Sequence, residues 1–215
     1  MIPEIPEENE FLNRCRMFQR DERRDLYYTV ATAHVSDHLN DPASMANAVA
    51  LLLLNWNWGY YRFGKRYGPL DFEKLEACIS KNYIIINNFR DRDISTLSEE
   101  DDPVIRNLFN DFLEATMLVS EKIKDRKSPV SVAKALHVLV PTFFPLWDSS
   151  IAENYAKSYV KKYESKCEEY VYFCKQIKCI YQHVRNYQGL RNDEILSKKN
   201  LIKLIDEYNY SKYTA

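Results

Sequence analysis

Glycine is scarce in this chain, and its scarcity restricts the folds that the chain can adopt. Only 4 of the 215 residues are glycine, about 2% against an average of roughly 7%, and three of the four lie in residues 55–69. Turn-rich β architectures use glycine wherever the backbone needs a positive φ angle, so this composition disfavours them. Neither glycine-rich phosphate loop, G-x-G-x-x-G or G-x-x-x-x-G-K-S/T, occurs, which argues against the common nucleotide-binding folds.

Apolar residues recur at helical spacing along most of the chain. This spacing predicts helices over residues 25–39, 43–54, 71–88, 102–124, 130–140, 155–187 and 192–208. Helix-start signals support several of them, because Asp102 and Ser128 each precede a proline, and Ser150 with Glu153 matches a capping box. Gly189 is expected to end the helix before it. We therefore predict an all-α protein, with residues 1–215 in a single domain.

The composition indicates a soluble protein of the cytoplasm. The formal net charge is −1, with 46% hydrophobic and 28% charged residues, which is typical of a globular domain. The acidic start of the chain lacks the apolar stretch of a signal peptide, and the longest apolar run, Ala48–Leu54, is too short to cross a bilayer. The five cysteines form no C-x-x-C pair and are expected to be reduced thiols. Nothing in the sequence indicates an oligomeric state.

The segment Pro141–Tyr155, PTFFPLWDSSIAENY, places one acid behind a run of prolines and aromatics. Asp148 can cap the following helix, because its carboxylate can accept backbone N–H groups and complement the helix dipole. In a cleft, the same carboxylate can stabilise a developing cation or position a water molecule. A nearby aromatic such as Trp147 could stack on a flat ligand. The sequence leaves both roles of Asp148 open.

A second segment, Asn55–Pro69, interleaves aromatics with cations and is predicted to be a loop. Such a pattern can stack on nucleobases and hold backbone phosphates. The candidate base-contacting residues are Trp56, Trp58 and Tyr61, and the candidate phosphate-binding residues are Arg62, Lys65 and Arg66. The alternative is that the aromatics cover the core while the cations extend into water.

The histidines do not indicate a metal site. His34 and His38 have the spacing of one helix face but lack the glutamate of an H-E-x-x-H motif, so a solvated pair is the better interpretation. His137 falls on the apolar helix 130–140 and is assigned to the core or to the edge of a cleft. We expect no metal and no cofactor.

The segment Glu114–Tyr155, about a fifth of the chain, resembles the helix–hairpin–helix DNA glycosylases (the HhH-GPD superfamily). Residues 127–133, KSPVSVA, are similar to the hairpin where it enters its second helix, and residues 145–148, PLWD, are similar to the turn that carries the catalytic aspartate. The resemblance implies two interleaved helical lobes with a cleft between them, one lobe from residues 1–50 and 150–215 and the other from residues 55–147. It also implies a nucleobase flipped out of duplex DNA into the cleft.

The resemblance also assigns roles to residues of this chain. Asp148 would be the catalytic residue, with the extruded base held by residues drawn from Trp147, Trp58, Trp56, Tyr61 and His137. The phosphate backbone would be held by the helix end at Ser128, with Arg126, Lys127 and Lys134 beside it.

Three features of the chain depart from the family pattern. The hairpin carries no glycine. The position of the nucleophilic lysine of strand-cutting members is matched by Ser131, while Lys134 falls one turn later, which favours an enzyme that only removes the base. Cys167 and Cys174 match the first spacing of the family's iron–sulfur motif, but Cys179 does not continue it, so we interpret all three as packed or free thiols.

Three functions remain as alternatives. The first is a DNA-repair-like base glycosylase with Asp148 as its catalytic residue. The second is a non-catalytic helical module that binds nucleic acid or protein through residues 55–69, in which Asp148 is only a helix cap. The third is a helical enzyme acting on a free nucleoside, which would need no phosphate contacts.

Overall fold

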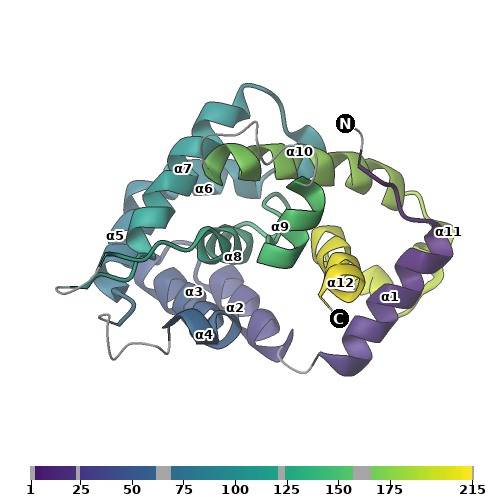
Figure 1. The fold of residues 1–215 in the computed structure, drawn as a ribbon, viewed down its shortest axis with the longest axis horizontal. Helices are drawn as coiled ribbons and strands as arrows, with labels where there is room; N and C mark the ends of the chain where they lie inside the picture. Colours follow the sequence, from purple (N-terminus) through teal and green to yellow (C-terminus); the bar gives the residue numbers. More distant parts are fainter. Residues whose placement is uncertain (1–2, 23–24, 62–68, 121–123, 157–165, 215) are drawn as a thin grey trace.

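The computed structural model describes residues 3–22, 25–61, 69–120, 124–156 and 166–214, and it confirms the prediction of an all-α protein (Figure 1). Within these residues the α-helices are α1 (Glu8–Asp21), α2 (Asp25–Asp37), α3 (Pro42–Trp56), α4 (Trp58–Tyr61), α5 (Phe72–Lys81), α6 (Tyr83–Arg90), α7 (Asp101–Ala115), α8 (Pro129–Leu139), α9 (Ser149–Ala156), α10 (Lys166–Val184), α11 (Gln188–Asn192) and α12 (Leu201–Tyr213). Two short 3-10 helices are η1 (Ile94–Thr96) and η2 (Leu196–Lys198).

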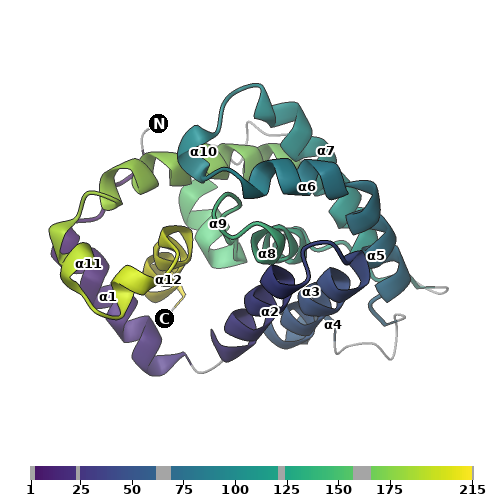
Figure 2. The same cartoon turned by 180° about the vertical axis from the view of Figure 1, so that it is seen from behind.

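Helix α8 lies near the centre of the molecule (Figures 1 and 2). Its sequence is apolar on nearly every side, which is the pattern of a helix that is buried all round. It packs against α2, α3, α7 and α10. The predicted start at Ser128 is confirmed, because the Ser128 side chain caps the helix and Pro129 is its first residue.

Helices α1 and α12 pack against each other although they are far apart in the sequence (Figures 1 and 2). The Arg14 guanidinium donates to the Ser211 carbonyl at 2.7 Å, and the Cys15 thiol donates to the Leu204 carbonyl at 3.3 Å. Helix α12 also packs against α9 and α10, so it joins α1 to the central helices. The division of the chain into two lobes stays a prediction.

Two predicted helices have different bounds in the structure. The helix expected over 71–88 is two helices, α5 and α6, which meet at the buried Asn82. The Asn82 side-chain amide donates to the Cys78 carbonyl and to Asp111 Oδ2, both at 3.0 Å. Because this amide satisfies backbone and carboxylate groups at the junction, the chain can change direction there without exposing its core.

The prediction that Asp102 caps a helix reaching residue 124 is wrong. Helix α7 includes Asp102 and ends at Ala115. The acid that organises its start is Asp101, which accepts the Ser98 N–H at 2.8 Å and pairs with both guanidinium nitrogens of Arg92 at 2.7 Å. After α7, the backbones of Leu118 and Arg126 pair through two hydrogen bonds of 2.9 Å, which local helical spacing does not predict.

The expectations for the last part of the chain also need correction. Gly189 lies inside α11 rather than ending α10, and a Cβ atom there would lie 2.5 Å from Leu12 Cδ1 of α1. A larger residue at this position would therefore require the Leu12 side chain to shift. The final helix begins at Leu201, capped by Asn200, whereas Asp193 accepts the N–H groups of Ile195 and Leu196 at the start of η2.

No helix in the described ranges has both the length and the apolar character that crossing a bilayer requires.

Candidate functional site

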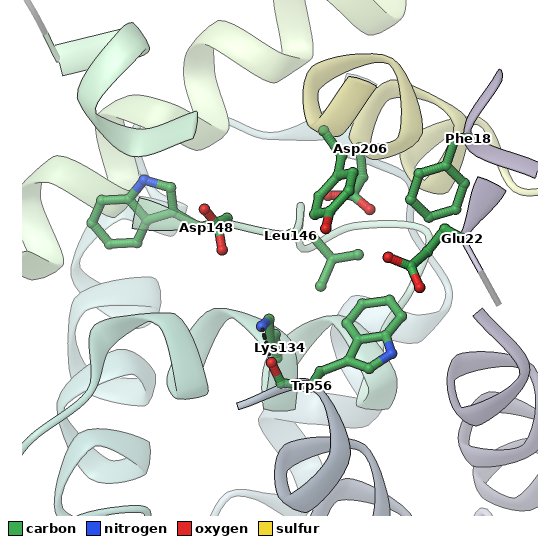
Figure 3. A pocket seen from close by; sticks show the side chains of 9 residues that line it. Phe18, Glu22, Trp56, Lys134, Leu146, Asp148 and Asp206 are labelled. Carbon is green, nitrogen blue, oxygen red and sulfur yellow. Dashed lines mark hydrogen bonds between the residues drawn. The ribbon is translucent and has the colours of Figure 1, made fainter. Parts of the chain in front are cut away.

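A pocket of about 120 Å³ opens where the central helices meet α1 and α12 (Figure 3). Its lining residues come from α1, α3, α8, α12 and the turn before α9 and are Phe18, Glu22, Trp56, Lys134, Leu146, Trp147, Asp148, Asp206 and Tyr210. We call Lys134 and residues 146–148 the Asp148 wall, and Phe18, Glu22, Asp206 and Tyr210 the Asp206 wall. In Figure 3, Asp148 and Lys134 lie toward one end of the pocket and Phe18 and Glu22 toward the other.

The turn before α9 fixes Asp148 at the edge of the pocket. Phe143, Phe144 and Trp147 are buried, and the Trp147 ring packs against Phe109, Tyr170 and Phe173. With this turn anchored by aromatic packing, the chain enters α9 directly after Trp147. Trp147 therefore mainly anchors the turn. It lines the pocket, but only 3% of the residue is exposed.

Asp148 performs the capping role and also lies in the pocket. Its Oδ1 accepts the Ser150 N–H at 3.0 Å, and its carbonyl accepts the Ala152 N–H at 2.7 Å, which places Asp148 at the N-cap of α9. The expected Ser150–Glu153 capping box is therefore wrong. Oδ2 accepts no hydrogen bond from the described part of the chain, and this oxygen is available to a ligand in the pocket.

Lys134 brings a cation to the same wall. This residue of α8 is 8% exposed, and its ammonium donates to Asn57 Oδ1 at 2.5 Å and to the Trp56 carbonyl at 3.4 Å. Asn57 is held in turn, because its amide donates to Ser131 Oγ at 2.7 Å. The ammonium also lies 5.7 Å from the centre of the Trp56 ring, a cation–π distance. These contacts hold Lys134 in place inside the pocket.

Trp56 provides the aromatic surface between the two walls. Its ring is stacked on Tyr28 with 5.9 Å between ring centres and 22° between planes. Tyr28 stacks in turn on His137, with 5.3 Å between centres. A flat ligand entering the pocket would meet a ring that is already supported from behind.

His137 supports this stack from the core and does not line the pocket. Its Nδ1 lies 2.6 Å from the Phe144 carbonyl oxygen, which can only accept, so Nδ1 carries the proton. Nε2 is then the acceptor for the Tyr28 hydroxyl at 3.1 Å. Complete burial lowers the pKa of His137 to about 3, against a smaller opposite effect of the Phe144 carbonyl, so the imidazole is neutral at pH 7.

The Asp206 wall rests on a buried group of charges that sequence reasoning missed. The ammonium of Lys203 lies 3.1 Å from Asp25 Oδ1, 3.3 Å from Asp206 Oδ2 and 3.6 Å from Glu207 Oε1. Lys199 pairs with Glu207 at 2.6 Å and with Asp25 at 3.4 Å. We call these five residues, Asp25, Lys199, Lys203, Asp206 and Glu207, the Lys203 cluster.

Aromatic rings enclose the Lys203 ammonium as well. The ring centres of Phe18, Tyr28 and Trp56 lie 4.3, 5.1 and 5.4 Å from it. Burial alone would lower the pKa of Lys203, but Asp206, Glu207 and Asp25 together raise it above its usual value, so the lysine stays charged. Burial raises the pKa of Asp206 to about 6, although attraction by Lys203 acts in the opposite direction.

The remaining predicted site residues lie outside the pocket or outside the described residues. Tyr61 is buried and its hydroxyl donates to the Thr116 carbonyl at 3.3 Å, while Trp58 is 48% exposed on α4. The Arg126 guanidinium covers the Tyr60 ring at 4.8 Å, and Lys127 pairs with Glu114. Arg62, Lys65 and Arg66 lie outside the described residues.

The helix end at Ser128 offers few free donors for a phosphate. Ser128 Oγ accepts the Ser131 N–H at 3.2 Å, and Pro129 has no N–H. Among the first three residues of α8, only the N–H of Val130 is left. The structure thus brings Asp148, Trp147, Trp56 and Lys134 together, and it does not place Ser128, Arg126 or Lys127 with them.

The described residues contain no group of three or more His, Cys, Asp or Glu side chains arranged to hold a metal ion. Comparisons of the chain with protein-family models, with curated proteins and with solved structures gave no match. The function must therefore be argued from the site itself.

Proposed function

We propose that the protein is a base glycosylase that hydrolyses the N-glycosidic bond of a nucleobase flipped out of duplex DNA. The observation that carries this proposal is the position of Asp148. One carboxylate oxygen is fixed by the N-terminus of α9, and the residue lines a pocket that also holds an aromatic ring and an ammonium group. A carboxylate held in this way can stabilise positive charge that develops in a bound substrate.

The pocket contains the groups that this reaction needs. The base would stack on Trp56, which Tyr28 supports. As the bond from C1′ to the base nitrogen breaks, its electron pair leaves with the base and the sugar becomes cationic. Asp148 would stabilise that cation and position the water that adds to C1′. Lys134 would contact an oxygen of the bound nucleotide, since its ammonium is held at the pocket by Asn57.

The order of elements around Asp148 supports, as part of this proposal, the section of a helix–hairpin–helix arrangement that runs from the second hairpin helix to the acid. Helix α8 begins at a capped serine, a turn with two prolines follows, and the acid stands at the start of the next helix. The acid faces a pocket between α8 and the paired helices α1 and α12. In this proposal that pocket is the cleft into which the base is flipped.

The proposal is tested by base release from duplex oligonucleotides carrying uracil, hypoxanthine, 8-oxoguanine or 7-methylguanine. We expect wild type to release at least one base and Asp148→Asn to lose about a hundredfold or more of that rate, because asparagine caps a helix but carries no negative charge. Asp71→Asn is the matched control, since Asp71 caps α5 by accepting the Lys74 N–H at 3.0 Å.

Either of two results would contradict the proposal. The first is release of no base from any of the four duplexes by wild type, with Asp148→Asn equally stable, which would leave Asp148 a helix cap. The second is cleavage by Asp148→Asn as fast as by Asp71→Asn. In both cases the exposed Trp58 and the rest of the segment 55–69 would become the first place to look for a binding partner.

The charge of the pocket favours a second candidate function, hydrolysis of a free nucleoside. Three of the lining residues, Glu22, Asp148 and Asp206, carry carboxyl groups, and Lys134 is the cation among those lining residues. Carboxylates repel the phosphates of a DNA strand but not an uncharged nucleoside. Parallel assays with free inosine and with a hypoxanthine duplex separate the two candidates.

A further inference from the structure

We infer that the carboxyl group of Asp206 donates a proton to the departing base, while the carboxylate of Asp148 stabilises the sugar. This inference rests on the proposed function and assigns a second residue to its reaction. Asp206 lines the same pocket as Asp148 but reaches it from α12, which packs against α1. Figure 3 shows the two carboxyl groups on different sides of the pocket, with Leu146 between them in the view.

The two carboxyl groups have opposite environments. Asp148 is half-buried and accepts a backbone N–H at the positive end of α9, which stabilises a negative charge. Asp206 is 8% exposed and lies against the Lys203 cluster. Where two acids of one site differ in this way, the more deeply buried one is suited to carry a proton.

The charges of the Lys203 cluster favour a proton on Asp206 at mildly acidic pH. The cluster contains three carboxyl groups, on Asp25, Asp206 and Glu207, and two ammonium groups, on Lys199 and Lys203. With all five ionised, the cluster itself would carry one negative charge in excess, which Lys134 across the pocket offsets only in part. A proton on one carboxyl group removes the excess. Asp206 is the member of the three that lines the pocket, so its proton is within reach of a ligand.

The surroundings of Asp206 agree with this assignment. Burial raises its pKa to about 6, Glu207 acts in the same direction, and Lys203 and Lys134 act against them. Asp206 Oδ2 accepts from Lys203 at 3.3 Å, and Oδ1 makes no hydrogen bond to the described residues. The titratable groups of the pocket and the cluster are Glu22 at the end of α1, Asp25 and Tyr28 of α2, Lys134 of α8, Asp148 before α9, Lys199 before α12, and Lys203, Glu207 and Tyr210 of α12.

The step balances as a hydrolysis. The Asp206 O–H bond breaks and its proton goes to a ring nitrogen of the base, while the electron pair of the C1′–N bond goes to the base. Water adds to the cationic C1′ and gives its own proton to solvent. The free base and the sugar hydroxyl are the products, and Asp206 regains its proton from solvent before the next turnover.

The inference is tested with two duplex substrates that differ in the charge of the base. Hypoxanthine is neutral and leaves more easily once protonated, whereas 7-methylguanine is already cationic and needs no added proton. In wild type between about pH 5 and 8, hypoxanthine release should fall about tenfold per pH unit above roughly pH 6, because it needs the acid form of Asp206. Release of 7-methylguanine should lack this decline.

The variant Asp206→Asn should lose about a hundredfold of hypoxanthine release but less than about threefold of 7-methylguanine release. Asp206→Glu should restore part of the hypoxanthine rate. Asp71→Asn is the matched control, because it makes the same change of residue at a helix cap that does not line the pocket. It should change the release of both bases by the same factor.

The outcomes separate this inference from the proposed function. Equal losses for both bases in Asp206→Asn, or release of 7-methylguanine alone by wild type, would overturn the role of Asp206 and leave the glycosylase intact. If wild type releases none of the four bases in the panel, the proposed function itself is overturned. If Asp206→Asn fails to fold, the inference is tested by the pH dependence of wild-type release of the two bases. The same pH dependence for hypoxanthine and 7-methylguanine would refute it.

Discussion

The Asp148 wall of the pocket is made from one continuous segment, Ser128–Ile151, whereas the Asp206 wall comes from α1 and α12. In the first, a serine that caps α8, two prolines in the following turn and an acid that caps α9 lie close together in the sequence. Each of them determines the backbone conformation next to it. In the second, contacts such as Arg14 to Ser211 join residues separated by 197 positions. Local sequence signals therefore predict the Asp148 wall but not the Asp206 wall.

The two walls also differ in what stabilises them. Behind the Asp148 wall lie aromatic rings and the neutral His137. Behind the Asp206 wall lies the Lys203 cluster, whose charges depend on one another for compensation. The first wall should therefore tolerate the loss of a single polar group, while the second should not.

Lys203→Met should have the largest effect on stability. Removing the ammonium leaves Asp25, Asp206 and Glu207 with Lys199 alone, so buried carboxylates lose their partner. We expect a loss of about 3–5 kcal/mol in the free energy of unfolding, measured by urea denaturation at pH 7. The exposed Lys198→Met is the matched control and should stay within about 0.5 kcal/mol of wild type. A loss below about 1 kcal/mol for Lys203→Met would show that the two walls do not differ in this respect.

His137 should make the other side of the pocket sensitive to acid. Its pKa is about 3 in the folded protein against an ordinary value of 6.5, so between these values the unfolded chain binds a proton that the native state does not. The contribution of neutral His137 to the free energy of unfolding is therefore complete above about pH 6.5 and is lost as the pH falls toward 3. In His137→Asn, whose amide can still donate to the Phe144 carbonyl, this loss is absent.

The measurement is the difference in unfolding free energy between wild type and His137→Asn as a function of pH. That difference should shrink by up to about 1.4 kcal/mol per pH unit below pH 6.5. Asp206, with its raised pKa, favours the folded state as the pH falls through about 6, but it is common to both proteins and cancels. The exposed His183→Asn is the control. A difference that is constant with pH would mean that His137 is not held neutral.

Ser128→Ala should have the smallest effect. It removes the cap that accepts the Ser131 N–H, and caps of this kind contribute about 1 kcal/mol. Thermal or urea unfolding measures the loss, with Ser149→Ala at an exposed position of α9 as the control. Ser128→Asn should recover most of the stability, because asparagine also caps well. A loss comparable to that of Lys203→Met would mean that the Asp148 wall also depends on a single polar group.

The same division between the two walls separates what the sequence predicts from what it misses. The cap at Ser128 and the position of Asp148 ahead of a helix depend on neighbours within a few residues, so they are visible in the sequence. Lys203, Asp206 and Glu207 have the i, i+3, i+4 spacing of an exposed charged face, yet they are buried. Local spacing does not reveal this burial, because Leu201, Leu204, Ile205 and Tyr208 supply an apolar face on the opposite side of the helix.

Two further differences have the same physical origin. Lys134 is predicted from the sequence to hold a phosphate beside the Ser128 helix end, whereas contacts with Asn57 and Trp56, more than 70 residues away, hold it in the pocket. Helix α7 ends at Ala115, and beyond it the backbones of Leu118 and Arg126 pair, which the apolar spacing of the segment does not reveal. In each case a tertiary partner outweighs the local preference of the chain.

The pairing of α1 with α12 has a kinetic consequence. The contacts from Arg14 to Ser211 and from Cys15 to Leu204 span 197 and 189 residues. Closing such long loops costs much chain entropy, and folding slows as contacts of this kind come to dominate a structure. The Ser128–Ile151 segment can take shape from its neighbours, but the Asp206 wall is complete only when α1 and α12 have met. The pocket is therefore completed late in folding, and it is lost as soon as these two helices separate, even while α8 remains folded.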